Sequence, residues 1–247
     1  LGLSKILTTE TRSFSSDASG AGSYETAHGG PLAYADETWN RQSTTVTNIY
    51  DVGGKLVDGT GAGSSLSNDG FDNYTASDIT QAFDIFNGDL KLTSSDTKSY
   101  TVTFDVNDDE VTGSFDGNPV RAVNADGTWN RQTTVVTSTY FDSGRMASSV
   151  GEGAGMSDDS FGSLTTSRTR QIFDRDLILA LGQAKLTQTL SESFNATDVD
   201  DDQVVGLTAA TFVEWNGVDD WEGRTSRDDS WNWQESIVRN LYDGTGR

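Results

Sequence analysis

Runs of β-branched and aromatic residues recur along the chain and predict strands. One covers Thr44–Tyr50, a second covers Thr133–Tyr140, and a weaker third covers Ser236–Tyr242. Val, Ile, Thr and Tyr fit the pleated, half-buried surface of a sheet. Turn-forming Asp, Ser and Gly residues follow each run. The first two strands should therefore return as hairpins, through residues 55–57 and 145–146.

A further hairpin signal lies beyond the first. Asn87-Gly88 separates the apolar-containing segments 81–86 and 89–93, and Asn-Gly in this setting is a strong signal for a two-residue hairpin. In the corresponding part of the second half, the apolar run Leu177–Leu181 is inserted, so we expect a longer hairpin there. Because no segment sustains an apolar period of 3.6 residues, little helix is expected.

A tryptophan-led pattern occurs three times in one register. Tyr follows each leading Trp by eleven residues, Gly follows by fifteen, and in the first two copies Phe follows by 32. Such recurrence indicates a repeat protein, whose units bury their apolar faces against neighbouring units. The residues expected in the repeat core or in assembly contacts are Trp39, Tyr50, Phe71, Trp129, Tyr140, Phe161, Trp231, Trp233 and Tyr242.

The spacing of the leading tryptophans also predicts how the chain divides. Trp39 and Trp129 are 90 residues apart, and Trp129 and Trp231 are 102 apart. The resulting segments are residues 1–37 as the C-terminal part of a preceding repeat, 38–127 as repeat 1, 128–229 as repeat 2, and 230–247 as the start of a third repeat.

The strand that begins at the first Trp has apolar residues on both faces. Trp39 and Ile49 fall on one side, and Val46 and Tyr50 fall on the other. A strand with one wet face would alternate more cleanly, so both faces should be partly covered. The sequence thus predicts an all-β protein of tandem antiparallel β-hairpin repeats, in an extended or stacked-sheet architecture that resembles a solenoid or ribbon.

The turns that end the strands resemble a known repeat. The segments Tyr50-Asp51-x-x-Gly54-Lys55-Leu56 and Tyr242-Asp243-x-x-Gly246-Arg247 are similar to the tyrosine–aspartate (YD, Rhs-type) repeat, whose core reads Tyr-Asp-x-x-Gly-Arg-Leu. The middle copy departs from it, because Phe141 moves the Asp one place along. The chain also resembles the long repeated segments of giant bacterial extracellular proteins. Both resemblances imply an architectural role, with hairpins that wind into large extracellular sheets and no catalytic residues.

Composition narrows the classes of partner. The net charge of −21 repels phosphate backbones, so we expect no nucleic-acid partner. No apolar run approaches the roughly 20 residues that cross a bilayer, so the chain should not span a membrane. The chain has no Cys and a single His, which excludes disulfides and thiolate zinc sites. This acidic composition, rich in Ser, Thr and Gly, suits an extracellular or cell-surface location.

Two acidic loops space oxygen ligands as the start of a calcium loop does. The candidate ligands are Asp105, Asn107, Asp109, Asp198, Asp200 and Asp202. Calcium takes six to eight oxygen ligands, and alternate positions of a loop supply them. The sixth position is Glu or Gln where a tight calcium loop needs Gly, so a solvated acidic turn is the simpler interpretation. Neither the calcium loop nor the solvated turn implies that a cofactor is required. If an ion binds, the spacing of oxygen ligands in these loops favours calcium.

Two other classes of function are weighed against an architectural role. Trp231 and Trp233 lie on one face of the last strand and suit a platform for sugar rings, as in an adhesin or carbohydrate-binding module; packing inside the repeat is the simpler role. Carboxylates are so common in the turns that their proximity in sequence carries no catalytic information. We therefore predict no enzyme.

The predicted function is a structural extracellular repeat protein. Its partners would be other copies of itself, because the partial repeats 1–37 and 230–247 can pair with neighbours by strand addition. A contact of this kind that does not close gives a filament or a surface array. A simpler origin for the partial repeats is that this segment was cut from a longer repeat polypeptide.

Overall fold

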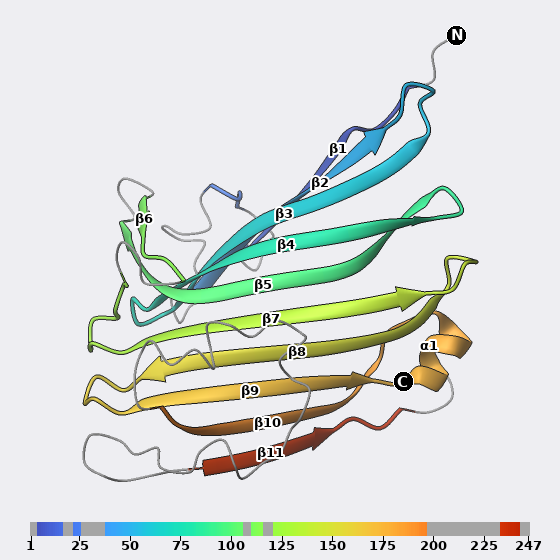
Figure 1. Ribbon diagram of the computed structural model, residues 1–247. Coiled ribbons are helices and arrows are strands. Elements are labelled where there is room, and N and C mark those ends of the chain that lie inside the picture. Colours follow the sequence, from blue (N-terminus) through green and yellow to red (C-terminus); the bar gives the residue numbers. More distant parts are fainter. Residues whose placement is uncertain are drawn as a thin grey trace. The chain divides into compact units, whose positions relative to one another are not determined.

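The computed structural model describes residues 4–16, 22–25, 38–105, 110–115, 121–196 and 233–242. These residues form an eleven-stranded antiparallel open sheet and one short helix (Figure 1). The elements are β1 (Thr8–Phe14), β2 (Thr38–Tyr50), β3 (Leu56–Asp69), β4 (Tyr74–Phe86), β5 (Asp89–Asp105), β6 (Glu110–Thr112), β7 (Trp129–Tyr140), β8 (Met146–Asp158), β9 (Leu164–Phe173), α1 (Arg175–Leu181), β10 (Leu186–Ala196) and β11 (Trp233–Arg239). The strand order is β1-β2-β3-β4-β5-β7-β8-β9-β10-β11, with β6 paired to β5. The all-β prediction is confirmed.

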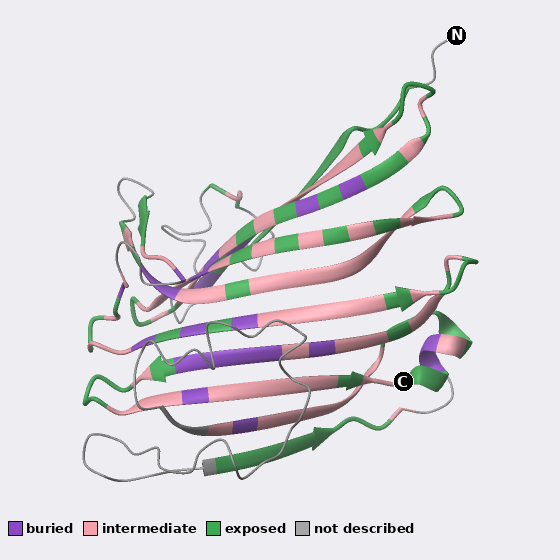
Figure 2. Cartoon of the chain, in the orientation of Figure 1, coloured by how far each residue is buried: buried purple, intermediate pink, exposed green. Residues whose placement is uncertain are grey.

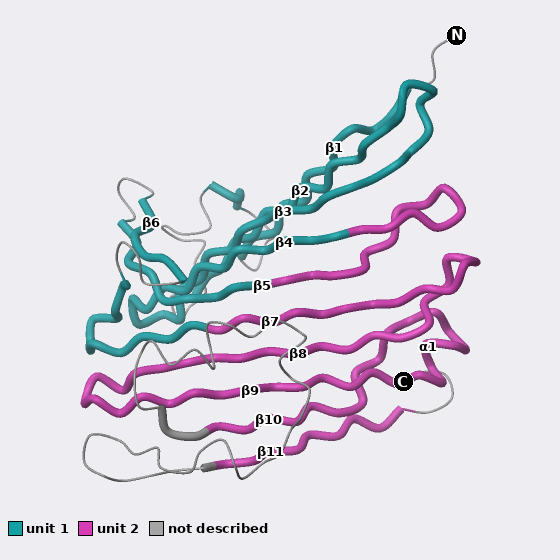
Figure 3. The backbone as a smooth tube through the Cα atoms, viewed as in Figure 1, with its two compact units in different colours: residues 1–82, 97–131 teal, residues 83–96, 132–247 magenta. Residues whose placement is uncertain are grey.

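The chain divides into two compact units that do not follow the predicted repeat boundaries (Figure 3). Unit 1 contains residues 1–82 and 97–131, and unit 2 contains residues 83–96 and 132–247. Strands β4, β5 and β7 each contribute a segment to both units. The division into repeats at residues 38, 128 and 230 therefore remains a prediction from the Trp spacing.

The predicted hairpins form where the turn residues indicated. The β2–β3 turn closes with the Gly54 N–H donating to Asp51 O at 2.9 Å, and the β7–β8 turn closes with the Gly144 N–H donating to Phe141 O at 2.8 Å. Both glycines have φ of 76°. This left-handed backbone conformation would be strained for a residue that has a side chain. Asn87-Gly88 makes the β4–β5 turn, with both residues in the positive-φ region that a type I′ hairpin turn requires.

The segment Leu177–Leu181, where a longer hairpin was expected, lies in the connection between the antiparallel strands β9 and β10 and forms part of the helix α1, which was not predicted. Asp174 caps the helix by accepting a hydrogen bond from the Leu177 N–H at 2.9 Å. Gly182 ends it in a left-handed conformation with φ of 69°. Leu177 and Ile178 are buried, and α1 packs against β8. The N-cap, the C-terminal glycine and the two buried apolar residues stabilise the helix. The helix is too short to show the apolar period of 3.6 residues in the sequence.

The core of unit 1 lies on the face of the sheet that carries Trp39. Trp39 is directly opposite Asn68 on β3, and Arg41 is opposite Leu66, so these side chains share a face. Trp39, Leu66, Ala76 and Val102 are buried, with Tyr74, Tyr100 and Phe104 packed around them. The rings of Trp39 and Phe104 meet edge to face with centroids 5.8 Å apart. Away from this cluster, residues 43–48 of β2 are half-buried on both faces, as the sequence indicated (Figure 2).

The core of unit 2 includes a buried ion pair. Glu192 on β10 is directly opposite Arg168 on β9, and the Arg168 Nε donates to Glu192 Oε2 at 2.7 Å. The Glu192 side chain is only 1% exposed, so removing Arg168 would take away one ion-pair partner of a charge in a dry site. Ala154 and Met156 are buried on β8.

Candidate functional site

The strand pairing between the end of one predicted repeat and the start of the next is called a seam here. The β1–β2 seam has seven residue pairs, which include Phe14 with Arg41. The β10–β11 seam also has seven pairs, which include Phe194 with Trp233. In the Trp alignment, Arg41 and Trp233 are corresponding positions. The two seams therefore have the same register.

A tyrosine hydroxyl bond occurs at corresponding positions of all three copies. Each hydroxyl donates to the main-chain oxygen of a residue that directly follows a lysine and lies in the facing strand or two residues before it. The bonds are Tyr50 to Ile6 at 2.9 Å, Tyr140 to Leu92 at 2.8 Å and Tyr242 to Leu186 at 3.0 Å. Tyr is thus placed in each copy by a bond across the seam.

Further bonds match between pairs of copies. The Asn48 amide donates to Ile6 O, and the Asn240 amide donates to Leu186 O, each at 3.0 Å. At the other end of the seam, the Asn40 N–H donates to Ser15 Oγ at 2.8 Å, and the Asn130 N–H donates to Thr101 Oγ1 at 2.9 Å. Each pairing thus has at least one such bond at an end, which fixes its register together with the strand ladder.

Strands β1 and β11 each have one neighbour in the strand order. In β1 the odd-numbered residues face β2, because the Asn48 N–H donates to Leu7 O and the Ser15 N–H donates to Asn40 O. Backbone groups alternate along an antiparallel strand, so the N–H and C=O of Glu10 point to the outer edge. The same reasoning from the Asn240 N–H, which donates to Thr187 O, points the backbone of Ile237 outward on β11.

Phe71 and Phe161 lie at exposed hairpin tips, and not in the core. They are 81% and 84% exposed. In both copies an aspartate holds the tip: Asp69 Oδ1 accepts from the Phe71 N–H, and Asp159 Oδ1 accepts from the Phe161 N–H, each at 2.9 Å. Hydrogen bonds from the main-chain N–H groups of Ser163 and Phe161 lower the pKa of Asp159. Phe71 and Phe161 thus occupy equivalent exposed positions and stay candidates for assembly contacts.

The remaining predicted site residues are described only in part. Asp105 lies exposed at the end of β5. Asn107, Asp109, Asp198, Asp200, Asp202 and Trp231 lie outside the described residues, and of Trp233 only the backbone in β11 is described. Within the described part of the chain, no group of three or more His, Cys, Asp or Glu could hold a metal ion. Calcium binding by the two acidic loops therefore remains a prediction.

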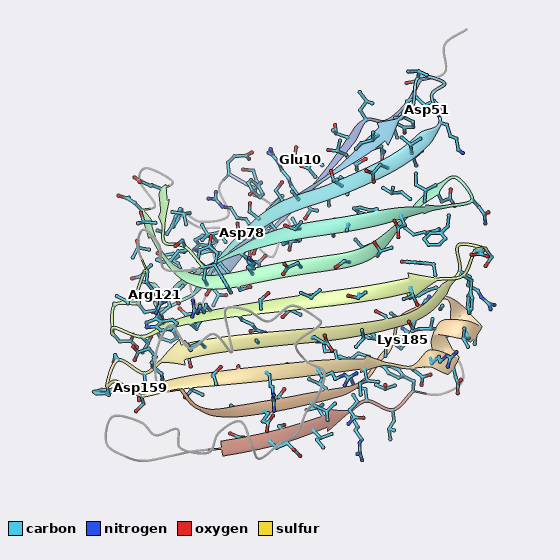
Figure 4. All side chains as sticks on the ribbon, in the orientation of Figure 1. Glu10, Asp51, Asp78, Arg121, Asp159 and Lys185 are labelled. Carbon is cyan, nitrogen blue, oxygen red and sulfur yellow. The ribbon has the colours of Figure 1, made fainter. Side chains whose placement is uncertain are left out.

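A polar pocket in unit 1 was not predicted from the sequence. It has a volume of about 200 Å³, and its apolar lining residues include Leu66 and Ala76. The polar lining residues are Tyr24, Arg41, Ser64, Ser65, Ser77, Asp78 and Tyr100. The Ser77 hydroxyl itself pairs with Ser99 Oγ at 2.8 Å, on the other face of the sheet. Figure 4 shows Asp78 on β4. The lining residues come from six separate segments of the chain, so no local sequence motif predicts the pocket.

Tyr100 and Asp78 are coupled in the pocket. The Tyr100 hydroxyl donates to Asp78 Oδ2 at 3.1 Å. Burial, and secondly the negative charge of Asp78, raise the pKa of Tyr100 to about 12. The hydroxyl therefore keeps its proton at neutral pH and stays a donor to the carboxylate.

Cations and aromatic rings alternate beside the pocket. The guanidinium carbons of Arg12 and Arg41 lie 5.0 Å and 5.5 Å from the centroid of the Tyr24 ring. A corresponding group contains Lys98 and Arg131, at 5.3 Å and 5.9 Å from the Phe115 ring. At the rim, hydrogen bonds from Arg12 and then from Ser43 lower the pKa of Glu10. Cation–π contact of this kind holds Arg41 in place at the pocket wall.

Comparison of the chain with protein-family models, curated proteins and solved structures finds no match. No helix in the described part of the chain has the length and apolar character of a membrane-spanning segment.

Proposed function

We propose that this chain is a structural, extracellular repeat protein whose strands pair with neighbouring copies to build a filament or a cell-surface array. The observation that carries the proposal is the shared register of the β1–β2 and β10–β11 seams. A junction that is made twice in the same way suits a protein that joins like units in series. The tyrosine hydroxyl bonds of the three copies support the same view.

The outer edges of β1 and β11 would carry the assembly. Every residue of β1 is exposed, and the residues described on β11 from Gln234 to Arg239 are exposed as well. An open edge offers a row of backbone donors and acceptors to an added strand. The YD-like turns and the acidic composition support the extracellular location that the proposal includes. The partner is a second copy of this chain or a like repeat.

A proline at an outward-facing backbone position tests the proposal. Glu10→Pro removes one N–H from the outer edge of β1 and leaves the ladder to β2 intact, whereas Glu10→Ala removes the same side chain and keeps the N–H. Ile237→Pro and Ile237→Ala form the corresponding pair on β11. We expect assembly, measured by light scattering and negative-stain electron microscopy, to be lost in each Pro variant and kept in each Ala variant.

Equal assembly of the Pro and Ala variants would refute edge pairing. The alternative function, an adhesin or carbohydrate-binding module built on Trp231 and Trp233, depends on side chains outside the described residues, and no contact in the described part favours it.

A further inference from the structure

We propose that the polar pocket of unit 1 binds a single ring of an uncharged carbohydrate. The inference goes beyond the architectural function, because the pocket lies on the Trp39 face and uses no backbone group of a strand edge.

The second copy shows that the fold does not require the polar lining. At an offset of 90 residues, Ser64 corresponds to Ala154, Ser65 to Gly155 and Asp78 to Arg168. The strands that carry them pair in the same register, since Ser64 is opposite Asp78 and Ala154 is opposite Arg168. The same hairpin therefore forms with either set of side chains. The hairpin itself therefore needs neither the hydroxyl of Ser64 nor the negative charge of Asp78, although the latter position carries a charge in both copies.

The corresponding positions are used for packing in unit 2. Ala154 is 1% exposed, and Met156, which corresponds to Leu66, is 2% exposed. Arg168 is held by Glu192 at 2.7 Å. In unit 1, by contrast, Ser64 and Asp78 are exposed and border the pocket. The first copy thus has an open polar site where the second has the buried side chains of Ala154 and Met156.

The lining suits a polyol and not an ion. Its charged residues are one cation, Arg41, and one anion, Asp78, so the lining has no net charge to offer an ionic ligand. Asp78 accepts hydrogen bonds, Arg41 donates them, and the hydroxyls of Ser64 and Tyr100 do both. A sugar ring presents adjacent hydroxyls that also donate and accept. The net charge of −21 further disfavours polyanionic ligands.

The size of the pocket limits the ligand. A volume of about 200 Å³ is below the roughly 300–1,000 Å³ of sites that enclose drug-sized ligands. One sugar ring fits this space better than an oligosaccharide does. Leu66 and Ala76, which are buried and line the pocket, give an apolar surface for the C–H face of the ring, and Tyr24 adds an aromatic ring to the lining.

Saturation-transfer NMR of the intact chain with the methyl pyranosides of glucose, galactose, mannose and N-acetylglucosamine tests the inference. We expect transfer to at least one of the four. The double variant Ser64→Ala/Asp78→Arg, which installs the residues of the second copy, should weaken binding about tenfold or more, as expected for loss of hydrogen bonds to a charged group. Tyr100→Phe, which keeps the ring, should weaken it less.

The matched control is Asp84→Arg, which makes the same charge change on the same strand outside the pocket lining. It should leave binding unchanged, and the circular dichroism of all variants should match that of the parent chain. Three outcomes overturn the proposal: no transfer to any of the four pyranosides, equal binding by Ser64→Ala/Asp78→Arg, or transfer only to the anionic methyl glucuronide. None of these outcomes bears on edge pairing, which the proline variants test separately.

Discussion

At the scale of single residues, the seam tyrosines combine apolar packing with one directed polar bond. The Tyr140 ring lies 5.3 Å from the Phe86 ring, and its hydroxyl donates to Leu92 O at 2.8 Å. Burial raises the pKa of Tyr140, so the hydroxyl remains a donor over the physiological range. Tyrosine often has this role at interfaces, with a partly buried ring and a polar tip that reaches a hydrogen-bond partner.

Tyr140→Phe should therefore lower the free energy of unfolding by about 0.5–1.5 kcal/mol, the net value of one hydrogen bond. Tyr140→Leu, which also removes the ring contact with Phe86, should cost more. Urea denaturation followed by circular dichroism measures both changes. An unfolding midpoint that Tyr140→Phe leaves unshifted would show that the hydroxyl bond contributes nothing.

The raised pKa of Tyr100 makes its contribution to the free energy of unfolding depend on pH in a known direction. Its pKa in the folded chain is raised to about 12 by burial and by Asp78, whereas an unfolded tyrosine titrates near pH 10. Below about pH 10 both states hold the proton, and the contribution to stability is fully present. Between about pH 10 and 12 the unfolded state loses the proton first, so that contribution is lost as the pH rises.

Phenolate absorbance should show a late-titrating tyrosine that disappears in Tyr100→Phe. Asp78→Asn should bring this titration to lower pH and leave part of the shift, because burial is the larger cause. An identical titration curve for Tyr100→Phe and the parent chain would contradict the assignment.

At the scale of elements, the strands and turns could be predicted because their signals are local. β-Branched runs marked β2 and β7, and Asn87-Gly88 marked the β4–β5 turn. The helix α1 was missed, since a run of five apolar residues fits a strand as well as it fits a short helix. Asp174 and Gly182, placed as a helix cap and a helix end, were the signals that could have identified it.

The pocket could not be predicted from local pattern. Tyr24, Asp78 and Tyr100 are distant in sequence, and each is an ordinary residue for its segment. Their convergence depends on strand register, which only the folded sheet defines. Aligning the two copies at the 90-residue offset would have shown the change from Ser64 and Asp78 to Ala154 and Arg168, and this was the one usable signal.

The glycine of β3 opposite Thr44 tests how closely these strands pack. A Cβ added to Gly63 would lie 2.4 Å from Ser43 O, a main-chain atom that cannot turn aside. Gly63→Ala should therefore destabilise the chain by about 1–3 kcal/mol, as overpacked sites do. Gly53→Ala is the control, because the added Cβ would meet only the Asp51 side chain, at 3.2 Å. Thermal unfolding of equal stability for the two variants would be inconsistent with this packing.

At the scale of the whole molecule, two properties oppose each other in assembly. Open strand edges favour the addition of neighbours, while a net charge of −21 makes copies repel one another. Salt screens this repulsion, and the Debye length falls from about 30 Å at 0.01 M to about 8 Å at 0.15 M. Assembly by edge pairing should therefore increase as the salt concentration rises over this range.

Electron microscopy of the purified chain across this range of salt tests the central claim most directly. The account predicts filaments or sheets that lengthen with added salt, and that are present for Glu10→Ala but missing for Glu10→Pro. Single particles of the mass of one chain at every salt and protein concentration would contradict it.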